Sequence, residues 1–222
     1  MGRKEVTGTP SRLSRLYLVR HGATAWSRSR QHAGRTDIPL NEQGEQDSRK
    51  LAGRLGEVRF SRVFTSPLQR ARRTCELAGL GRVAEIEPDL TEWDYGDYEG
   101  ELSLDTRKKR PEWNLFRDGG PGGESPAQVS ERADRLIARL RTLEGNIAVF
   151  SHGQFLRVVA ARWIGLPVGQ AQHFVLDTTS VSILGYEHDL TNESAILLWN
   201  AVSNEIFGDS GASANNGGQK SY

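Results

Sequence analysis

The chain has 222 residues, of which 36% are hydrophobic, 8% aromatic and 26% charged, a composition typical of soluble globular proteins. Because 29 Lys and Arg nearly balance 28 Asp and Glu, no overall field attracts nucleic acid or an acidic membrane, and any anion site must be local. The one cysteine, Cys75, excludes an intramolecular disulfide and favours a reducing compartment, so we expect a cytoplasmic protein.

Both ends of the chain are expected to lie outside a single domain that spans residues 14–207. Residues 1–13 contain charges and turn formers but no apolar run, which predicts a flexible arm that is neither a signal peptide nor a membrane span. Residues 208–222 are rich in Gly, Ser, Asn and Ala. This composition buries too little apolar area to offset the entropy of ordering, and it predicts a disordered tail.

Strand and helix signals alternate along the domain. Short apolar runs predict strands at residues 16–19, 62–65, 83–86, 147–150, 181–186 and 196–199. Helices are expected at residues 41–55 with Asn41 as a cap, from Pro67 in the first turn to about Ala78, at 125–140, and at 154–164. Residues 93–100 predict a loop dense in carboxylates and aromatics. The alternation predicts a three-layer α/β/α sandwich with a mainly parallel central sheet.

Two of the predicted strands run directly into a histidine followed by a glycine. His21-Gly22 follows the first strand, and His152-Gly153 follows the strand at residues 147–150. Ligands of open α/β sheets bind beyond the carboxyl ends of the strands, so both imidazoles are expected at one site. Each glycine lets the backbone approach a ligand closely and can begin a helix whose N–H groups face an anion.

Two arginines are expected beside these histidines. Arg20 directly precedes His21, and Arg70 falls in the first turn of the helix expected after Pro67. Such a set suits phosphoryl transfer, because guanidinium groups pair with phosphoryl oxygens and a neutral imidazole can attack phosphorus to form a phosphohistidine. The leaving alkoxide then needs a proton from a nearby carboxylic acid. For each residue alone, a structural hydrogen bond or a solvated surface charge is the alternative.

Several blocks of sequence occur in the order of one known family. Residues 18–24 (LVRHGAT) are followed by further blocks at residues 34–40, 65–71, 92–100, 122–125 and 151–153. Together they resemble the histidine phosphatase superfamily, which contains the cofactor-dependent phosphoglycerate mutases. The resemblance covers residues 14–200 and implies a phosphoglycerate mutase-like fold, a phosphohistidine mechanism, and no need for a metal or cofactor.

Carried over by position, the resemblance makes His21 the nucleophile and Glu92 the general acid, with Arg20, Arg70 and His152 lining the phosphate pocket. Glu92 shares its acidic loop with three other carboxylates, where structural hydrogen bonding is the alternative role. Further residues are expected to contact the substrate: Thr24, Ser27, Thr36, Tyr95, Trp113, Arg117 and Gln154.

Within the superfamily, residues 92–100 and 113–119 look most like the branch of broad-range acid phosphatases and sedoheptulose-bisphosphatase-like enzymes. The mutases have a longer cationic insertion, whereas only residues 101–121 are available here, and Ala33 stands where the mutases place a substrate-binding threonine. The basic run at residues 107–110 is expected to be a solvated helix face, with an anion-attracting rim as the alternative.

We therefore expect a metal-independent phosphatase of small phosphate monoesters, such as sugar phosphates or bisphosphates, that acts through a phosphohistidine. A phosphoglycerate mutase dependent on 2,3-bisphosphoglycerate is the alternative among enzymes, and a catalytically silent module that binds phosphorylated ligands is the alternative from another class. The expected partner is a small phosphorylated metabolite, without nucleic acid or membrane, and the oligomeric state is left open.

Overall fold

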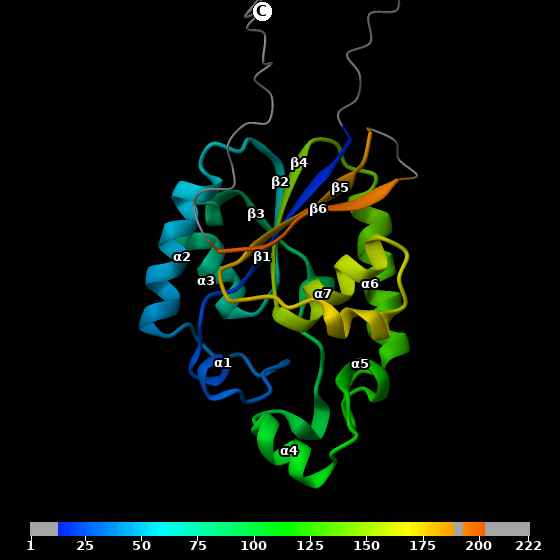
Figure 1. The fold of residues 1–222 in the computed structure, drawn as a ribbon. Coiled ribbons are helices and arrows are strands. Elements are labelled where there is room, and N and C mark those ends of the chain that lie inside the picture. The colour runs from blue at the N-terminus through cyan, green and yellow to red at the C-terminus, as the bar shows by residue number, and fades with distance from the viewer. Residues whose placement is uncertain (1–12, 189–192, 203–222) are drawn as a thin grey trace, which may run out of the picture.

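The computed structural model describes residues 13–188 and 193–202, which form a sheet with helices on both faces (Figure 1). The sheet has the strand order β3-β2-β4-β1-β5-β6. Its strands are β1 (Arg15–Arg20), β2 (Phe60–Thr65), β3 (Ala84–Ile86), β4 (Asn146–Ser151), β5 (Val181–Tyr186) and β6 (Ser194–Ala201). Neighbouring strands are parallel from β3 to β1, and β5 is antiparallel to both β1 and β6. The predicted sandwich with a mainly parallel sheet is confirmed.

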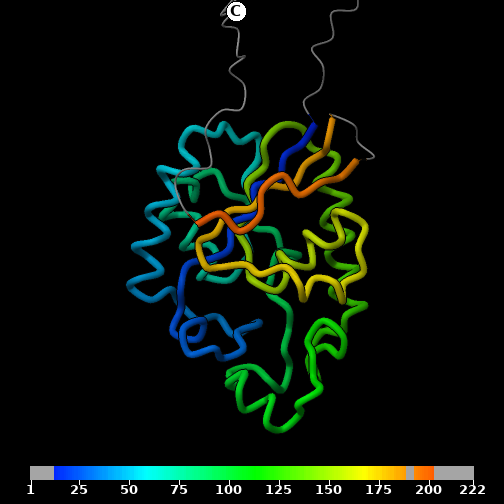
Figure 2. The backbone as a smooth tube through the Cα atoms, viewed as in Figure 1, coloured from blue at the N-terminus to red at the C-terminus, as the bar shows by residue number. Residues whose placement is uncertain are grey.

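Seven α-helices surround the sheet within the described part of the chain. They are α1 (Ala25–Ser29), α2 (Glu42–Leu55), α3 (Gln69–Leu77), α4 (Ser103–Lys109), α5 (Leu115–Asp118), α6 (Pro126–Leu140) and α7 (Gly153–Trp163). Helices α2 and α3 cover one face, α6 and α7 cover the other, and α1, α4 and α5 lie at one end (Figures 1 and 2). None of these helices is long and apolar enough to cross a bilayer. The predicted arm, apart from Leu13, and the predicted tail lie outside the described residues.

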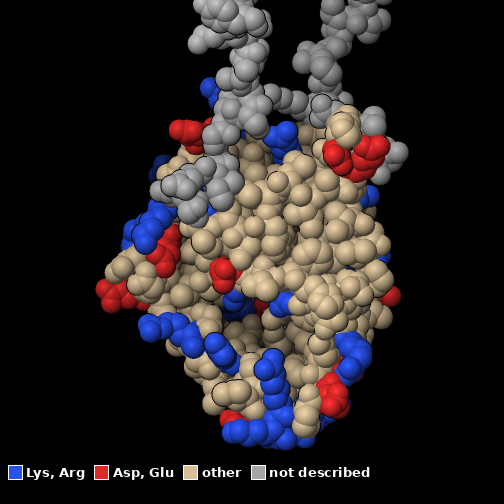
Figure 3. Space-filling view, viewed as in Figure 1, with Lys and Arg blue, Asp and Glu red and all other residues tan. Residues whose placement is uncertain are grey.

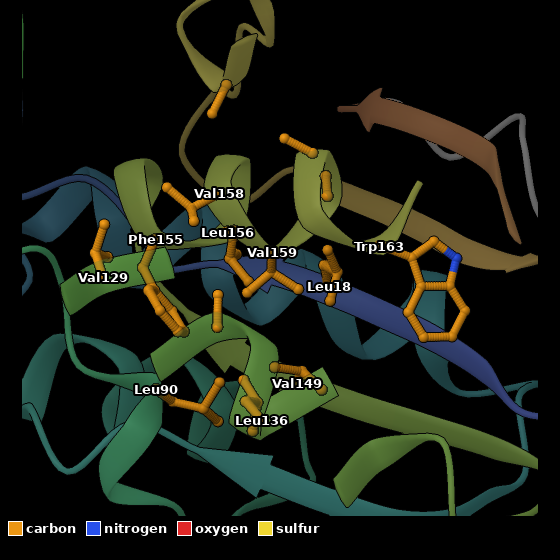
Figure 4. Packing of buried hydrophobic residues seen from close by; sticks show 14 of the residues in the cluster. Leu18, Leu90, Val129, Leu136, Val149, Phe155, Leu156, Val158, Val159 and Trp163 are labelled. Atoms are coloured by element: carbon orange, nitrogen blue, oxygen red, sulfur yellow. The ribbon is translucent and has the colours of Figure 1, made fainter. Parts of the chain in front are cut away.

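Side chains of the central strands divide alternately between two hydrophobic cores, as the pleat of a strand requires. On β1, Leu16 and Leu18 belong to the core that includes α6 and α7, whereas Tyr17 and Val19 belong to the core that includes α2 and α3. Figure 4 shows part of the first core, in which residues of the sheet meet residues of both helices: Leu18, Val149, Leu136, Phe155, Leu156 and Val159. The central strands β1 and β4 are thus buried on both faces, and this packing supports the residues that follow them.

Two predicted helix starts are confirmed by their capping bonds. The Asn41 side chain accepts the N–H of Gly44 at 2.8 Å at the start of α2. At the start of α6, Ser125 and Gln128 form a reciprocal capping box. Both caps satisfy backbone donors that a helix N-terminus otherwise leaves free.

The predicted place of Pro67 in the first turn of a helix is wrong. Helix α3 begins at Gln69, and its N-cap Leu68 is extended. The hydroxyl of Ser66 accepts the N–H of Leu68 at 3.2 Å, which holds the chain in a turn before the helix begins. Arg70 nevertheless falls in the first helical turn, as predicted.

The register of the sheet aligns the carboxyl ends of three strands. Arg20 at the end of β1 pairs with Ser151 at the end of β4, and Thr65 at the end of β2 pairs with Phe150 of β4. The backbone of His21 continues this ladder by donating to the carbonyl of Ser151 at 3.0 Å. The residues that follow these strands therefore share one edge of the sheet, at the end occupied by α1 and α4.

Candidate active site

A cavity of about 100 Å³ opens beyond the carboxyl ends of β1 and β4. Its wall is formed by residues from both strand ends, α1, α7 and the intervening loops: Arg20, His21, Thr24, Ser27, Gln31, Ala33, Glu92, Tyr95, Gly153, Gln154, Arg157 and Leu176. Figure 3 shows the molecule hollowed at this end of the sheet, with Lys and Arg side chains gathered beside the hollow. Most of the residues singled out from the sequence thus meet at one place.

A second, larger groove lies elsewhere and lacks the expected chemistry. It has a volume of about 320 Å³, lies between α2 and α3, and contains none of the predicted site residues. Its Arg73 is occupied by ion pairs with Glu45 at 2.9 Å and Glu76 at 3.3 Å. We therefore take the smaller cavity as the candidate active site.

Across the described residues, no three His, Cys, Asp or Glu side chains are grouped so that they could hold a metal ion.

His21 is buried in the wall of the cavity, with 5% of its surface exposed. Its Nδ1 lies 2.7 Å from the carbonyl oxygen of Gly22. Since a carbonyl only accepts, Nδ1 carries the proton and Nε2 keeps a free lone pair. Burial, together with the charges of Arg70 and Arg20, holds the pKa of His21 well below its usual value of 6.5. The imidazole is neutral at neutral pH, which is the form that can attack phosphorus.

His152 lies behind His21, with 5.2 Å between the centres of the two rings. Nε of Arg70 donates to its Nδ1 at 3.1 Å, so the proton of the neutral ring is on Nε2, which donates to the hydroxyl of Ser66 at 2.8 Å. Burial and the charge of Arg70 hold the pKa of His152 well below 6.5. The second imidazole is therefore neutral and held in one orientation.

Arg70 is fully buried and does not line the cavity. Besides its bond to His152, its guanidinium donates to three backbone carbonyls of the loop at residues 33–36, at 2.7 to 3.3 Å. Only one of its five N–H groups is left without such a bond. Arg70 fixes this loop and His152, and it contributes a positive charge from behind the cavity.

Arg20 lies in the cavity wall, and one end of its guanidinium is fixed. Its NH1 group donates to the carbonyl of Leu176, whereas its buried Nε has no hydrogen-bond partner. Gly153 lies against the guanidinium so closely that a Cβ there would come within 3.1 Å of Cζ. Burial lowers the pKa of Arg20, but an arginine remains a cation. A buried guanidinium in the wall of this cavity favours an oxyanion there.

Glu92 reaches the cavity because it caps helix α7 from another part of the chain. Its Oε1 accepts the N–H groups of Phe155 at 2.8 Å and Trp93 at 2.9 Å, and its Oε2 accepts the N–H of Gln154 at 3.0 Å. The N-cap residue itself, His152, makes no capping bond with its side chain. Glu92 therefore satisfies the free donors of the helix start, and they hold its carboxyl in the cavity wall.

Four of the residues expected to contact substrate also line the cavity: Thr24, Ser27, Tyr95 and Gln154. Thr24 and Ser27 form a capping box at the start of α1, with bonds of 2.9 and 3.0 Å to each other's backbone. Burial and the charge of Glu92 raise the pKa of Tyr95, so its phenol is protonated. These walls offer hydroxyl and amide groups rather than charge.

Three other residues expected to contact substrate are not brought to the cavity. The hydroxyl of Thr36 donates to Glu99 at 2.6 Å. The ring of Trp113 packs edge-on against Tyr98 and is half-buried against the hydrophobic core. Arg117 is exposed and pairs with its neighbour Asp118 at 2.8 Å.

Sequence reasoning missed one cation that lines the cavity, Arg157. Its guanidinium donates to the side-chain oxygen of Gln154 at 2.6 Å and to the carbonyls of Ala171 and Gln172 at 3.1 and 2.7 Å. The signal was available, because residues three apart on a helix share a face and Gln154 was already a candidate. With Arg20, Arg157 gives the cavity two positive charges.

Comparison with known proteins shows the family to which the chain belongs. The sequence profile of the histidine phosphatase superfamily (branch 1) matches residues 16–201. The chain belongs to this superfamily. A histidine phosphatase relative, an acid phosphatase from Mycobacterium tuberculosis, is 42% identical over 179 residues, which cover 78% of this chain and 87% of that protein. Sedoheptulose 1,7-bisphosphatase from Saccharomyces cerevisiae is 38% identical over 191 residues, or 72% of this chain and 70% of that one.

Solved histidine phosphatase structures have the same fold. The alpha-ribazole phosphatase from Shigella flexneri superposes with a TM-score of 0.74 at 30% identity, over 85% of this chain and 97% of that one. Relatives named for phosphoglycerate mutase match at 30 to 35% identity. The resemblance inferred from the motifs, and its preference for the acid phosphatase and sedoheptulose-bisphosphatase branch, are thereby confirmed.

Proposed function

We propose that this histidine phosphatase hydrolyses small phosphate monoesters, with sugar phosphates or bisphosphates as its substrate class. One observation carries the proposal: neutral His21, with a free Nε2, lines the same cavity as the guanidinium of Arg20. The names of the relatives, an acid phosphatase, a sedoheptulose bisphosphatase and an alpha-ribazole phosphatase, support the same reaction and substrate class.

From its single, buried Cys75 we also infer a cytoplasmic location, which cell fractionation tests.

The first half of the reaction forms a phosphohistidine. Arg20 pairs with the phosphoryl oxygens, and Nε2 of His21 attacks phosphorus. The bond from phosphorus to the substrate oxygen breaks, and protonated Glu92 gives its proton to that oxygen, which leaves as an alcohol. Arg70 and Arg20 offset the negative charge that gathers on the phosphoryl group.

The second half hydrolyses that intermediate. Ionised Glu92, held at the start of α7, takes a proton from a water molecule while the water oxygen attacks phosphorus. The bond from phosphorus to Nε2 of His21 breaks, inorganic phosphate leaves, and neutral His21 and protonated Glu92 are restored. Each group ends the cycle in the state in which it began.

The walls of the cavity support a hydroxylated substrate with a second anionic group. Gln154 and the hydroxyl group of Ser27 offer neutral polar contacts, while Arg157 adds a second guanidinium to the lining. A sugar bisphosphate presents both features. Arg157 would pair with its distal phosphate while Arg20 holds the one that is transferred.

Phosphoglycerate mutase is less well supported. A mutase must hold an intermediate with two phosphates and a carboxylate, but Arg20 and Arg157 are the only cations in the described lining, and Ala33 lines it as well. The basic run at residues 107–110 belongs to α4 and its end and does not line the cavity. A silent binding module is also disfavoured, because His21 is neutral and its Nε2 is free.

A screen of phosphate release over sugar phosphates, bisphosphates, phosphoglycerates, phosphopeptides and p-nitrophenyl phosphate tests the proposal. We expect the highest kcat/KM for a sugar phosphate or bisphosphate, without added 2,3-bisphosphoglycerate, and a phosphoenzyme that is labile in acid and stable in base. Bisphosphoglycerate-stimulated mutase turnover faster than phosphate release would contradict the proposal. Loss of activity on adding a chelator would contradict its metal-independent mechanism.

A further inference from the structure

The segment at residues 175–180 lies between α7 and β5. Its backbone groups form hydrogen bonds with both the side chain and the backbone of Arg20. The carbonyl of Leu176 accepts the NH1 group of Arg20. The N–H of Thr179 donates to the carbonyls of Arg20 at 3.1 Å and His21 at 3.3 Å, and the N–H of Arg20 donates to the carbonyl of Ser180 at 3.2 Å. The placement of the Arg20 guanidinium therefore depends on where this segment lies.

Two neighbouring residues of strand β6 hold the segment on either side of Leu176. The indole N–H of Trp199 donates to the carbonyl of Val175 at 2.7 Å. The side-chain oxygen of Asn200 accepts the N–H of Asp177 at 2.7 Å, and its amide group donates to the Asp177 carboxylate at 2.8 Å. The carbonyl that receives Arg20 is thus flanked by two fixed residues.

The backbone at Asn200 explains why asparagine suits this position. Its φ is 57°, in the left-handed region, which asparagine adopts more readily than most residues. Its N–H donates to the hydroxyl of Ser182 on β5 at 3.0 Å, where the register of the two strands shifts. Thr179 also has a left-handed φ, of 56°, although it is β-branched, and such strain persists only where the surroundings hold it.

We propose that Asn200, assisted by Trp199, is a positioning residue for the phosphatase reaction: it fixes the Leu176 carbonyl, which holds one end of the Arg20 guanidinium and so places Arg20 in the cavity wall to meet the substrate phosphate. The proposal rests on the function proposed above and deepens it, since neither residue of β6 lines the cavity. A long arginine side chain loses much rotational freedom when it binds a phosphate. Fixing it beforehand moves that cost from the binding step to folding.

The test compares Asn200→Gly, which keeps the left-handed backbone, with wild type and with Leu197→Ala, an exposed position on the same strand. We measure kcat and KM for p-nitrophenyl phosphate and the inhibition constant of inorganic phosphate. Asn200→Gly removes both side-chain bonds to Asp177 and should raise KM and the inhibition constant about fivefold to tenfold, the effect of one hydrogen bond lost between Arg20 and phosphate. Leu197→Ala should leave both unchanged.

A double-mutant cycle separates positioning from a merely structural role. In an Arg20→Ala background, Asn200→Gly should cause no further change in kcat/KM, because the group through which it acts is gone. Trp199→Phe keeps an aromatic side chain but has no N–H donor, and it should act in the same direction, so it carries the test if Asn200→Gly does not fold.

Three results would overturn the proposal: an equal loss in both backgrounds, a loss in kcat or melting temperature alone, or unchanged phosphate affinity in both variants. A wild-type protein that hydrolyses no phosphate monoester would instead overturn the proposed function. Calorimetric binding of inorganic phosphate would then still compare Asn200→Gly with wild type, and equal affinities would refute the role of Asn200.

Discussion

Glu92→Gln should reduce both the stability and the activity of this enzyme, by separate physical routes. The glutamine oxygen can still accept the N–H groups of Phe155 and Trp93, but its NH₂ group would face the N–H of Gln154, which now lies 3.0 Å from Oε2. Losing this charge-assisted bond costs about 1.5–3 kcal/mol. For the ionised form of Glu92, removing the negative charge from the start of α7 costs about 0.3–1 kcal/mol more. The free energy of unfolding should therefore fall by about 2–4 kcal/mol.

Thermal unfolding measures this loss. For a domain of this size, a loss of 2–4 kcal/mol lowers the melting temperature by about 5–15 °C. Glu124→Gln is the matched control, because Glu124 accepts bonds from Arg132 and from the N–H of Asp94 but does not line the cavity. It should lower the melting temperature and leave activity unchanged at temperatures where the variant is folded. An unchanged melting temperature in Glu92→Gln would refute the capping argument.

Activity measures the second route. A general acid contributes about 10²- to 10⁴-fold, so Glu92→Gln should slow hydrolysis of an alkyl phosphate at least about 100-fold. Its effect on p-nitrophenyl phosphate should be far smaller, because that phenolate leaves without a proton. Equal losses on the two substrates would remove Glu92 from the role of acid.

His21→Ala should lower kcat by several orders of magnitude and abolish the phosphoenzyme trapped by rapid quenching, and near-normal turnover would exclude His21 as the nucleophile. Since the pKa values of buried His21 and His152 lie well below 6.5, the unfolded chain binds more protons than the folded one as the pH falls. The contribution of these neutral histidines to the free energy of unfolding is complete above about pH 6.5 and declines below that pH. Urea unfolding should show the decline, and His152→Gln should make the decline smaller. A free energy of unfolding that does not change with pH would contradict the argument. Arg157→Gln should raise KM for a sugar bisphosphate at least about fivefold and leave that for p-nitrophenyl phosphate nearly unchanged. The control is Arg162→Gln, since Arg162 lies on the same helix but pairs with Asp134 at 2.8 Å, and equal effects would remove Arg157 from substrate recognition.

Much of the fold could be predicted because its signals are local. The strand at residues 147–150 is a continuous apolar run, and the helix starts at Asn41 and Ser125 are set by side chains that bond to a backbone group three residues away. The segment at residues 101–121 has no such period: the basic run at residues 107–110 indicated a solvated helix face on α4, but the bounds of α4 and the existence of α5 could not be predicted. The prediction for Pro67 was wrong although its signal is also local. The hydrogen bond from the N–H of Leu68 to Ser66 outweighed the preference of proline for the first helical turn.

The sequence by itself determined that His21 and His152 follow buried strands, since the apolar run and the His-Gly pair are adjacent in the chain. Only the tertiary structure decided how these residues are held and what stands beside them. Glu92 meets the start of α7 across 62 residues of chain, and Arg20 meets Leu176 across 156. The same packing admitted Arg157 to the cavity and left Arg117 outside it. Such contacts depend on which elements pack against each other, and a local pattern of residue types does not show which distant residues will meet.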